Sequence, residues 1–90
     1  MGFYRRLPLT VEARQVTADS GAELARWCKG TWRPGGPLAP ALLLVPTLEG
    51  DLAAWDGDWV VRGTRGEFWP VKAGIFEATY ESAAGGEQGA

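Results

Sequence analysis

The chain has 90 residues, 46% of them apolar, and a formal net charge of −2. A domain of this length buries a modest fraction of its surface, so we expect it to gain stability by forming a homo-oligomer. The negative balance disfavours binding of duplex nucleic acid through many phosphate contacts. With one cysteine and no histidine, the chain lacks an internal disulfide and an ordinary Cys/His zinc site.

The amino-terminal segment is polar at first and then alternates. Residues 4–6, Tyr-Arg-Arg, are not followed by the apolar core of a secretion signal, and no stretch approaches the roughly 20 apolar residues of a membrane span. We therefore expect a cytoplasmic protein with no membrane partner, metal or cofactor. Alternation of apolar and polar residues predicts a first strand over 7–16, with Pro8 favouring an edge position.

A helix is predicted to follow this strand. Ser20 and Glu23 have the spacing of a reciprocal amino-terminal cap, and Gly30 can take the left-handed conformation that ends a helix. Residues three and four apart form one apolar stripe, which consists of Leu24, Trp27 and Cys28. We interpret the cysteine as an inert packing thiol.

The middle of the chain reads as a loop and then a hairpin. Residues 31–40 are rich in Gly and Pro, which predicts a loop in which Trp32 is either a lid over the core or an exposed contact residue. The apolar run 41–48 and the segment 51–55 flank a turn and predict a hairpin.

Short strands and turns continue toward the carboxyl end. Strands are predicted at 59–62 and 67–71, with turns at 56–58 and 63–66. Residues 72–81 carry Gly and a β-branched Thr, so we expect a single helical turn that plugs the sheet rather than a long helix.

These elements predict one α+β domain over residues 1–81. Its architecture is expected to be a small, twisted, mainly antiparallel sheet of about five strands with one helix packed on one face. Residues 82–90 contain no large apolar side chain and are expected to form a disordered tail.

The stretches YRRLPLTVEARQVT and GDWVVRGTRGEFWPVKAGIFEATYE resemble a family of small proteins of tailed bacteriophages and prophages. Relatives often carry Cys where Val71 stands and a shorter, less Pro-rich segment in place of residues 31–40. The family has no established activity, so the resemblance implies a phage setting, in the cytoplasm of an infected bacterial host, and a compact fold. The matching residues are Tyr4, Arg5, Arg6, Pro8, Glu12, Ala13, Gly57, Asp58, Gly63, Gly66, Glu67, Pro70, Lys72, Ile75, Phe76, Glu77, Tyr80 and Glu81.

The residue inventory disfavours an enzyme. There is no imidazole base, and the two serines, Ser20 and Ser82, lie at the predicted cap and in the tail. Asp56 and Asp58 flank Gly57 in a predicted turn, where turn formation is favoured over acid–base chemistry. A small hydrolase that uses these carboxylates is the least favoured hypothesis.

The turn Gly63–Gly66 is the best candidate for ligand contact. Two glycines allow close approach to the backbone, Thr64 lies between them, and Arg65 can fork onto a phosphate with Arg62 beside it. An ordinary hairpin turn explains the same residues. Glu67 is expected either to orient one of these arginines or to form a simple cross-strand ion pair.

The aromatic residues of the two late strands complete the predicted site. Trp59, Phe68 and Trp69 are candidates for stacking on a base, although core packing is expected for at least two of them. Phe68 and Trp69 face opposite sides of their strand, and Trp69 is expected to be the outward one. We expect the ligand-binding set to be Arg62, Arg65, Trp69, Trp59, Arg5 and Thr64, with no catalytic or metal-binding residue.

Two functions fit this pattern. The first is a non-enzymatic phage accessory protein, an oligomer that sequesters a small phosphorylated nucleotide signal of host antiviral defence, such as a cyclic nucleotide. The second is a protein-interaction module in which Trp32, Trp55 and Trp69 bind a host or phage protein and the arginines keep the surface soluble.

Overall fold

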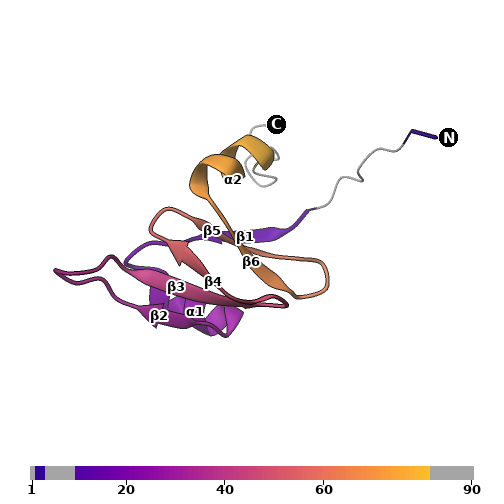
Figure 1. Ribbon diagram of the computed structural model, residues 1–90. Coiled ribbons are helices and arrows are strands. Elements are labelled where there is room, and N and C mark those ends of the chain that lie inside the picture. The colour runs from indigo at the N-terminus through magenta and orange to yellow at the C-terminus, as the bar shows by residue number, and fades with distance from the viewer. Residues whose placement is uncertain (1, 4–9, 82–90) are drawn as a thin grey trace.

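The computed structural model describes residues 2–3 and 10–81 and contains, within these ranges, six strands and two helices. The α+β class with antiparallel pairing is confirmed (Figure 1). No helix in the described ranges is long and apolar enough to cross a membrane. In chain order the elements are β1 (Glu12–Gln15), α1 (Gly21–Cys28), β2 (Thr31–Arg33), β3 (Leu42–Thr47), β4 (Gly50–Trp55), β5 (Trp59–Arg62), β6 (Phe68–Val71) and α2 (Ala73–Thr79).

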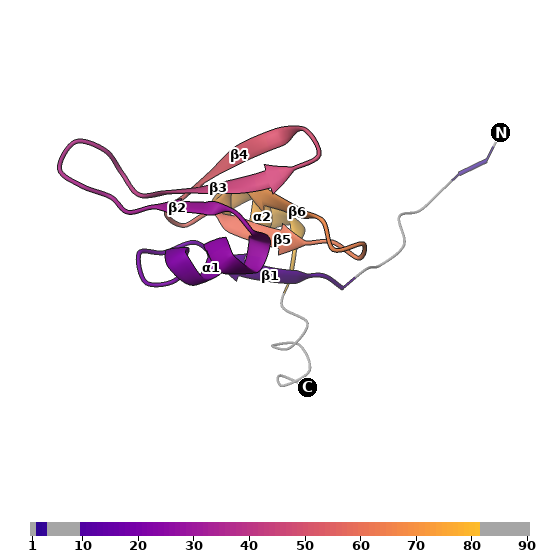
Figure 2. The ribbon, with the colours of Figure 1, turned by 90° about the horizontal axis from the view of Figure 1, so that it is seen from below.

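The strands form two antiparallel sheets rather than one. Their orders are β1-β5-β6 and β2-β3-β4, and β6 contacts both β3 and β4 of the other sheet. The chain passes from one sheet to the other at the turn Asp56–Gly57, where Gly57 has a φ of 92° that favours glycine. Figure 2 shows α1 and the strands β1, β5 and β6 on the same side of the β2-β3-β4 sheet.

The main core lies where α1 meets the inner faces of the two sheets. Alternation along β3 buries Leu43 and Val45 and leaves Leu42 and Leu44 on the opposite face. Val60 of β5 closes the core from the other sheet, and Phe68 packs against it. The buried core cluster consists of Val16, Leu24, Cys28, Leu43, Val45, Ala54 and Val60.

Helix α1 begins directly after Ser20, but the predicted reciprocal cap is wrong. The Ser20 hydroxyl donates to the Gln15 carbonyl oxygen at 2.8 Å and accepts from the Thr17 amide at 2.9 Å, so it closes the preceding turn. The left-handed residue at the helix end is Lys29, with a φ of 61°, rather than Gly30. Gly30 instead lies against the Leu44 carbonyl oxygen, where no Cβ would fit.

The predicted loop at 31–40 is wrong for its first three residues, which form β2. Pairing with β3 places Trp32 opposite Leu43, and the half-buried indole packs against the core and against Gly21. Of the two roles expected for Trp32, the structure therefore shows the lid over the core and not the exposed contact residue. The reason is tertiary, because β3 supplies hydrogen-bond partners that the Gly- and Pro-rich local sequence does not predict.

Helix α2 is longer than the single turn expected, and none of its residues is buried. It follows β6 directly and lies near β5 and β1 (Figure 1). Several expectations fall outside the described residues. These are the basic run 4–6, the first part of the strand at 7–9 and the tail 82–90.

Candidate functional site

Alternation along β5 and β6 divides the predicted binding residues between two faces. Arg62 lies opposite Phe68 in the ladder, whereas Trp59 lies opposite Val71 and Trp69 opposite Val61. Trp59 and Trp69 therefore share one face of the β1-β5-β6 sheet, and Arg62 lies on the other face with Phe68. The structure does not bring Arg62 together with these two indoles. Arg5 lies outside the described residues.

The face that carries Trp59 and Trp69 is covered in part by α2. The Trp59 ring stacks on Phe76 with ring centroids 4.2 Å apart and 8° between the planes, and Phe76 stacks on Tyr80 at 4.7 Å. The Trp59 indole nitrogen is buried and has no hydrogen-bond partner among the described residues. Trp69 is half-buried on the same face. One side of the Trp59 ring is thus occupied by the protein itself.

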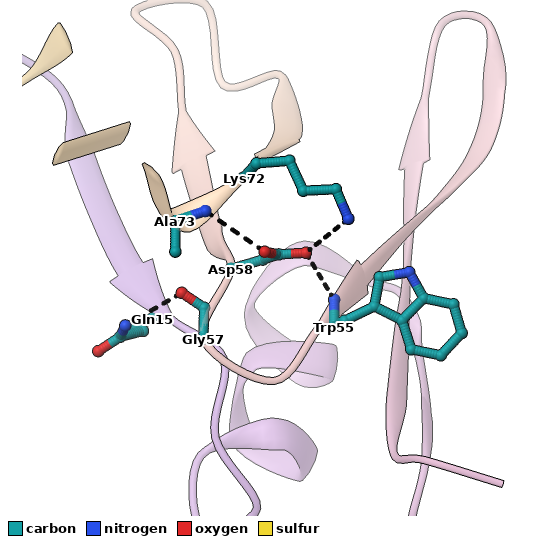
Figure 3. A network of polar contacts seen from close by, with 6 residues as sticks. All are labelled: Gln15, Trp55, Gly57, Asp58, Lys72 and Ala73. Atoms are coloured by element: carbon teal, nitrogen blue, oxygen red, sulfur yellow. Dashed lines mark hydrogen bonds and ion pairs between the residues drawn. The ribbon is translucent and has the colours of Figure 1, made fainter. Parts of the chain in front are cut away.

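Asp58 is the side chain that connects this helix to the rest of the fold. It is 7% exposed, and Oδ2 accepts from the Trp55 amide at 2.9 Å and from Lys72 Nζ at 3.4 Å. Oδ1 accepts from the Ala73 amide at 3.4 Å, at the start of α2. Figure 3 shows the donors reaching the carboxylate from the end of β4 and from the junction of β6 and α2. The carboxylate thereby fixes the position from which Phe76 reaches Trp59.

The neighbouring Gly57 adds a second connection at the same place. Its amide donates to the Val16 carbonyl oxygen at 2.8 Å, and its own carbonyl oxygen accepts from Gln15 Nε2 at 3.0 Å (Figure 3). Asp56 is exposed, whereas Asp58 is occupied by the contacts above. These positions favour a structural turn, and the two carboxylates do not form a paired acid–base site.

The turn between β5 and β6 has the hairpin geometry that its glycines predict. The Gly66 amide donates to the Gly63 carbonyl oxygen at 3.0 Å, and Gly66 has a φ of 84°. Glu67 Oε1 accepts from the backbone amide of Arg65 at 3.0 Å, so among the described residues this carboxylate bonds to the main chain and pairs with neither guanidinium group. The side chains of Thr64 and Arg65 are exposed.

Arg62 has a different acidic neighbour from the one expected. Its Nη1 lies 3.8 Å from Oε1 of Glu12, the residue directly opposite it on β1. Both side chains are about half exposed, at 50% and 45%, so this pair contributes at most about 1 kcal/mol to stability. The guanidinium group is therefore only loosely held and remains accessible to another anion.

An open cleft of about 370 Å³ lies beside this turn. It is formed by the end of α1, the turn between β3 and β4, and the turn between β5 and β6. Local sequence reasoning missed this site because its three segments are far apart in the chain, although one of them is the predicted Gly63–Gly66 turn. The lining residues are Cys28, Lys29, Pro46, Thr47, Leu48, Gly66, Glu67 and Phe68.

The cleft has an apolar wall and one charge of each sign. Phe68 packs edge-on against Trp27 with ring centroids 5.0 Å apart, which holds the ring in place. Lys29 supplies an ammonium group and Glu67 a carboxylate. Burial raises the pKa of the Cys28 thiol above its ordinary value, partly offset by a backbone hydrogen bond from Gly30, so the thiol stays protonated at neutral pH. This chemistry is suited to binding and not to nucleophilic attack.

The part of the chain that the structure describes contains no group of three His, Cys, Asp or Glu side chains placed to hold a metal ion. No protein-family model matches the chain, and no curated protein or solved structure matches it either. The likeness to phage proteins and the phage setting that it implies therefore stay predictions.

Proposed function

We propose that this chain is a non-enzymatic binding protein that captures a small phosphorylated nucleotide at the cleft beside the Gly63–Gly66 turn. The observation that carries the proposal is a cleft of about 370 Å³ bordered by an ammonium group, an aromatic ring and a glycine turn. Pockets for small ligands have volumes of roughly 300–1,000 Å³, so this cleft accepts one nucleotide-sized molecule.

The phosphate end of the ligand is assigned to the side of the cleft formed by Lys29 and Gly66. Gly66 has open space where a side chain would stand, so an oxygen can approach its backbone closely. Lys29 provides a point charge, and the exposed Arg65, one residue before Gly66, provides a guanidinium fork within the same turn. The contacts of Lys29 and Arg65 are charge-assisted hydrogen bonds to phosphate oxygens, whereas Gly66, whose amide already donates to the Gly63 carbonyl oxygen, contributes only open space.

The base end of the ligand is assigned to Phe68. The half-buried Phe68 ring offers an apolar surface to a base, and Arg62 lies beside it on the same sheet face. The Glu67 carboxylate accepts from the Arg65 backbone amide at 3.0 Å, within the turn to which the phosphate is assigned, so it opposes part of the attraction that Lys29 and Arg65 exert on an anion.

Capture without turnover agrees with the residue inventory and with the resemblance to phage proteins. A chain with no histidine has no imidazole for general base catalysis. The proposed role is to sequester a nucleotide signal of antiviral defence in the cytoplasm of an infected bacterium. Sequestration requires only affinity and a sufficient copy number.

Isothermal titration calorimetry at low salt tests the proposal, with mononucleotides, cyclic dinucleotides and ADP-ribose derivatives as ligands. Lys29→Gln and Arg65→Gln are each expected to weaken binding roughly tenfold, the effect of one charge-assisted hydrogen bond. Arg26→Gln is the matched control, because Arg26 is exposed on α1 and neither lines the cleft, as Lys29 does, nor directly adjoins a lining residue, as Arg65 adjoins Gly66.

Absence of heat for every ligand would remove the proposal, as would equal weakening by the Arg26 variant. A host or phage protein retained equally by the parent and by Lys29→Gln in a pull-down would instead favour the protein-interaction module.

A further inference from the structure

The β2-β3-β4 sheet has one covered face and one that no described element covers. Leu43 and Val45 point toward α1, so Leu42 and Leu44 of the same strand lie on the other side. The register places Trp55 opposite Leu42 and Ala53 opposite Leu44, so these two side chains share that side. We call Leu42, Leu44, Ala53 and Trp55 the outer face. In Figure 2, α1 and the other sheet lie on the opposite side.

The outer face is apolar where a solvated sheet face is ordinarily polar. An antiparallel sheet that packs one face on a core carries polar side chains on the other. Here Leu42, Leu44 and Ala53 are half-buried, and Trp55 is 37% exposed. Four adjacent apolar side chains on two neighbouring strands form the kind of patch that marks a contact with another protein.

Two opposite charges flank this patch at diagonal corners. Arg33 lies opposite Leu42 on the outer side of β2, and Asp51 lies opposite Pro46 at the start of β4. Both residues are exposed, and neither forms an ion pair with another described residue. Leu44 occupies the central strand between them, two residues from the level of each. The outer face is thus positive at one corner and negative at the opposite corner.

This arrangement is complementary to itself. Consider a two-fold axis that lies in the plane of the outer face, passes over Leu44 and runs perpendicular to the line from Arg33 to Asp51. Rotation about that axis places Arg33 of each copy over Asp51 of the other, so both ion pairs form at once. Trp55 lies near the axis, and the two indoles meet. The strands of the two copies then cross steeply, as in orthogonal sheet packing.

We propose that the outer face binds a second copy of this chain and forms a two-fold symmetric dimer. The apolar centre and the reciprocal charges are both properties that such an interface requires, and a domain of 90 residues gains stability from association. The outer face shares no residue with the cleft, so the dimer does not depend on the proposed nucleotide binding.

Charge reversal at the two corners tests the dimer on the full chain. The dissociation constant is measured by sedimentation equilibrium for the parent, Arg33→Glu and Asp51→Arg. Each single variant faces like charges twice in its own dimer, so the constant is expected to rise at least tenfold. Arg26→Glu, an exposed substitution on α1, is the matched control and leaves the constant unchanged.

Mixing the two variants distinguishes direct contact from a general effect of charge. A heterodimer of Arg33→Glu with Asp51→Arg has opposite charges at both corners, so the mixture is expected to recover association that neither variant shows alone. Far-UV circular dichroism confirms that each variant is folded. A parent protein that stays monomeric overturns the proposal, because another segment of the chain or another protein would then be the partner that covers the outer face. Failure of the mixture to associate more tightly than its components also overturns it.

Discussion

Replacing Asp58 with alanine is expected to lower the free energy of unfolding by about 2–4 kcal/mol, since a hydrogen bond to a charged acceptor contributes about 1.5–3 kcal/mol. The strongest bond lost is the one from the Trp55 amide, at 2.9 Å. The bonds from the Ala73 amide and Lys72 Nζ are both 3.4 Å long, near the limit, and contribute less. The Lys72 side chain is 63% exposed, so the ion pair contributes at most about 1 kcal/mol.

Two measurements check this value. Urea unfolding followed by tryptophan fluorescence gives the change in free energy directly, and a thermal melt is expected to shift down by roughly 10–30 °C for a domain of this size. Lys72→Met is expected to lower the free energy of unfolding by no more than about 1 kcal/mol. Asp56→Ala is the matched control, because Asp56 is exposed in the same turn, and its effect is expected to stay within about 0.5 kcal/mol.

The order of these three effects decides whether the reasoning is right. Equal losses for Asp56→Ala and Asp58→Ala would show that the buried carboxylate has no special role. A loss for Lys72→Met as large as that for Asp58→Ala would show that the ion pair, and not the Trp55 amide, dominates. Because Ala73 opens α2, the Asp58 variant is also expected to weaken the near-UV circular dichroism of the Trp59–Phe76 stack.

Two further predictions concern packing and pH. Gly21→Ala is expected to lower the free energy of unfolding by about 1–3 kcal/mol, because a Cβ at this position would overlap the Trp32 ring. Gly74→Ala, with open space in α2, is expected to raise the free energy of unfolding by up to about 1 kcal/mol. Equal effects of the two substitutions in urea unfolding would contradict this prediction. Because burial raises the pKa of Cys28, the unfolded thiol loses its proton first as pH rises, so stability falls once the pH passes the unfolded value. Between pH 7 and about 10, the melting temperature of Cys28→Ala should fall less than that of the parent. Parallel curves of melting temperature against pH for the two proteins would refute the burial argument.

Elements with a strong local pattern were predictable from the sequence. The strand 59–62 has the predicted bounds, and the flanking turns follow because Gly57 and Gly66 take positive φ values that other residues rarely adopt. Helix α1 also begins where Ser20 suggested, although the hydroxyl group bonds elsewhere. These features depend on contacts between residues that are close in the chain.

Only some of the residues that share a face or line the cleft could be predicted from the sequence. Residue parity along β5 was enough to separate Trp59 from Arg62, because side chains alternate between the two faces of a strand. No local pattern indicated that Lys29 would line the cleft, since the left-handed conformation was expected at Gly30. Trp32 was likewise predicted to lie in a loop, but it pairs with Leu43 of β3 and therefore lies in a strand.

The sequence by itself determined the α+β class, most of the strands and turns, and the scarcity of catalytic groups, because composition and alternation act over a few neighbouring residues. Only the tertiary structure decided how the strands divide into two sheets, which side chains surround the cleft and which sheet face stays uncovered. Those outcomes depend on the packing of segments 19 or more residues apart, such as Lys29, Leu48 and Phe68 around the cleft. Local propensity carries no information about contacts of that range.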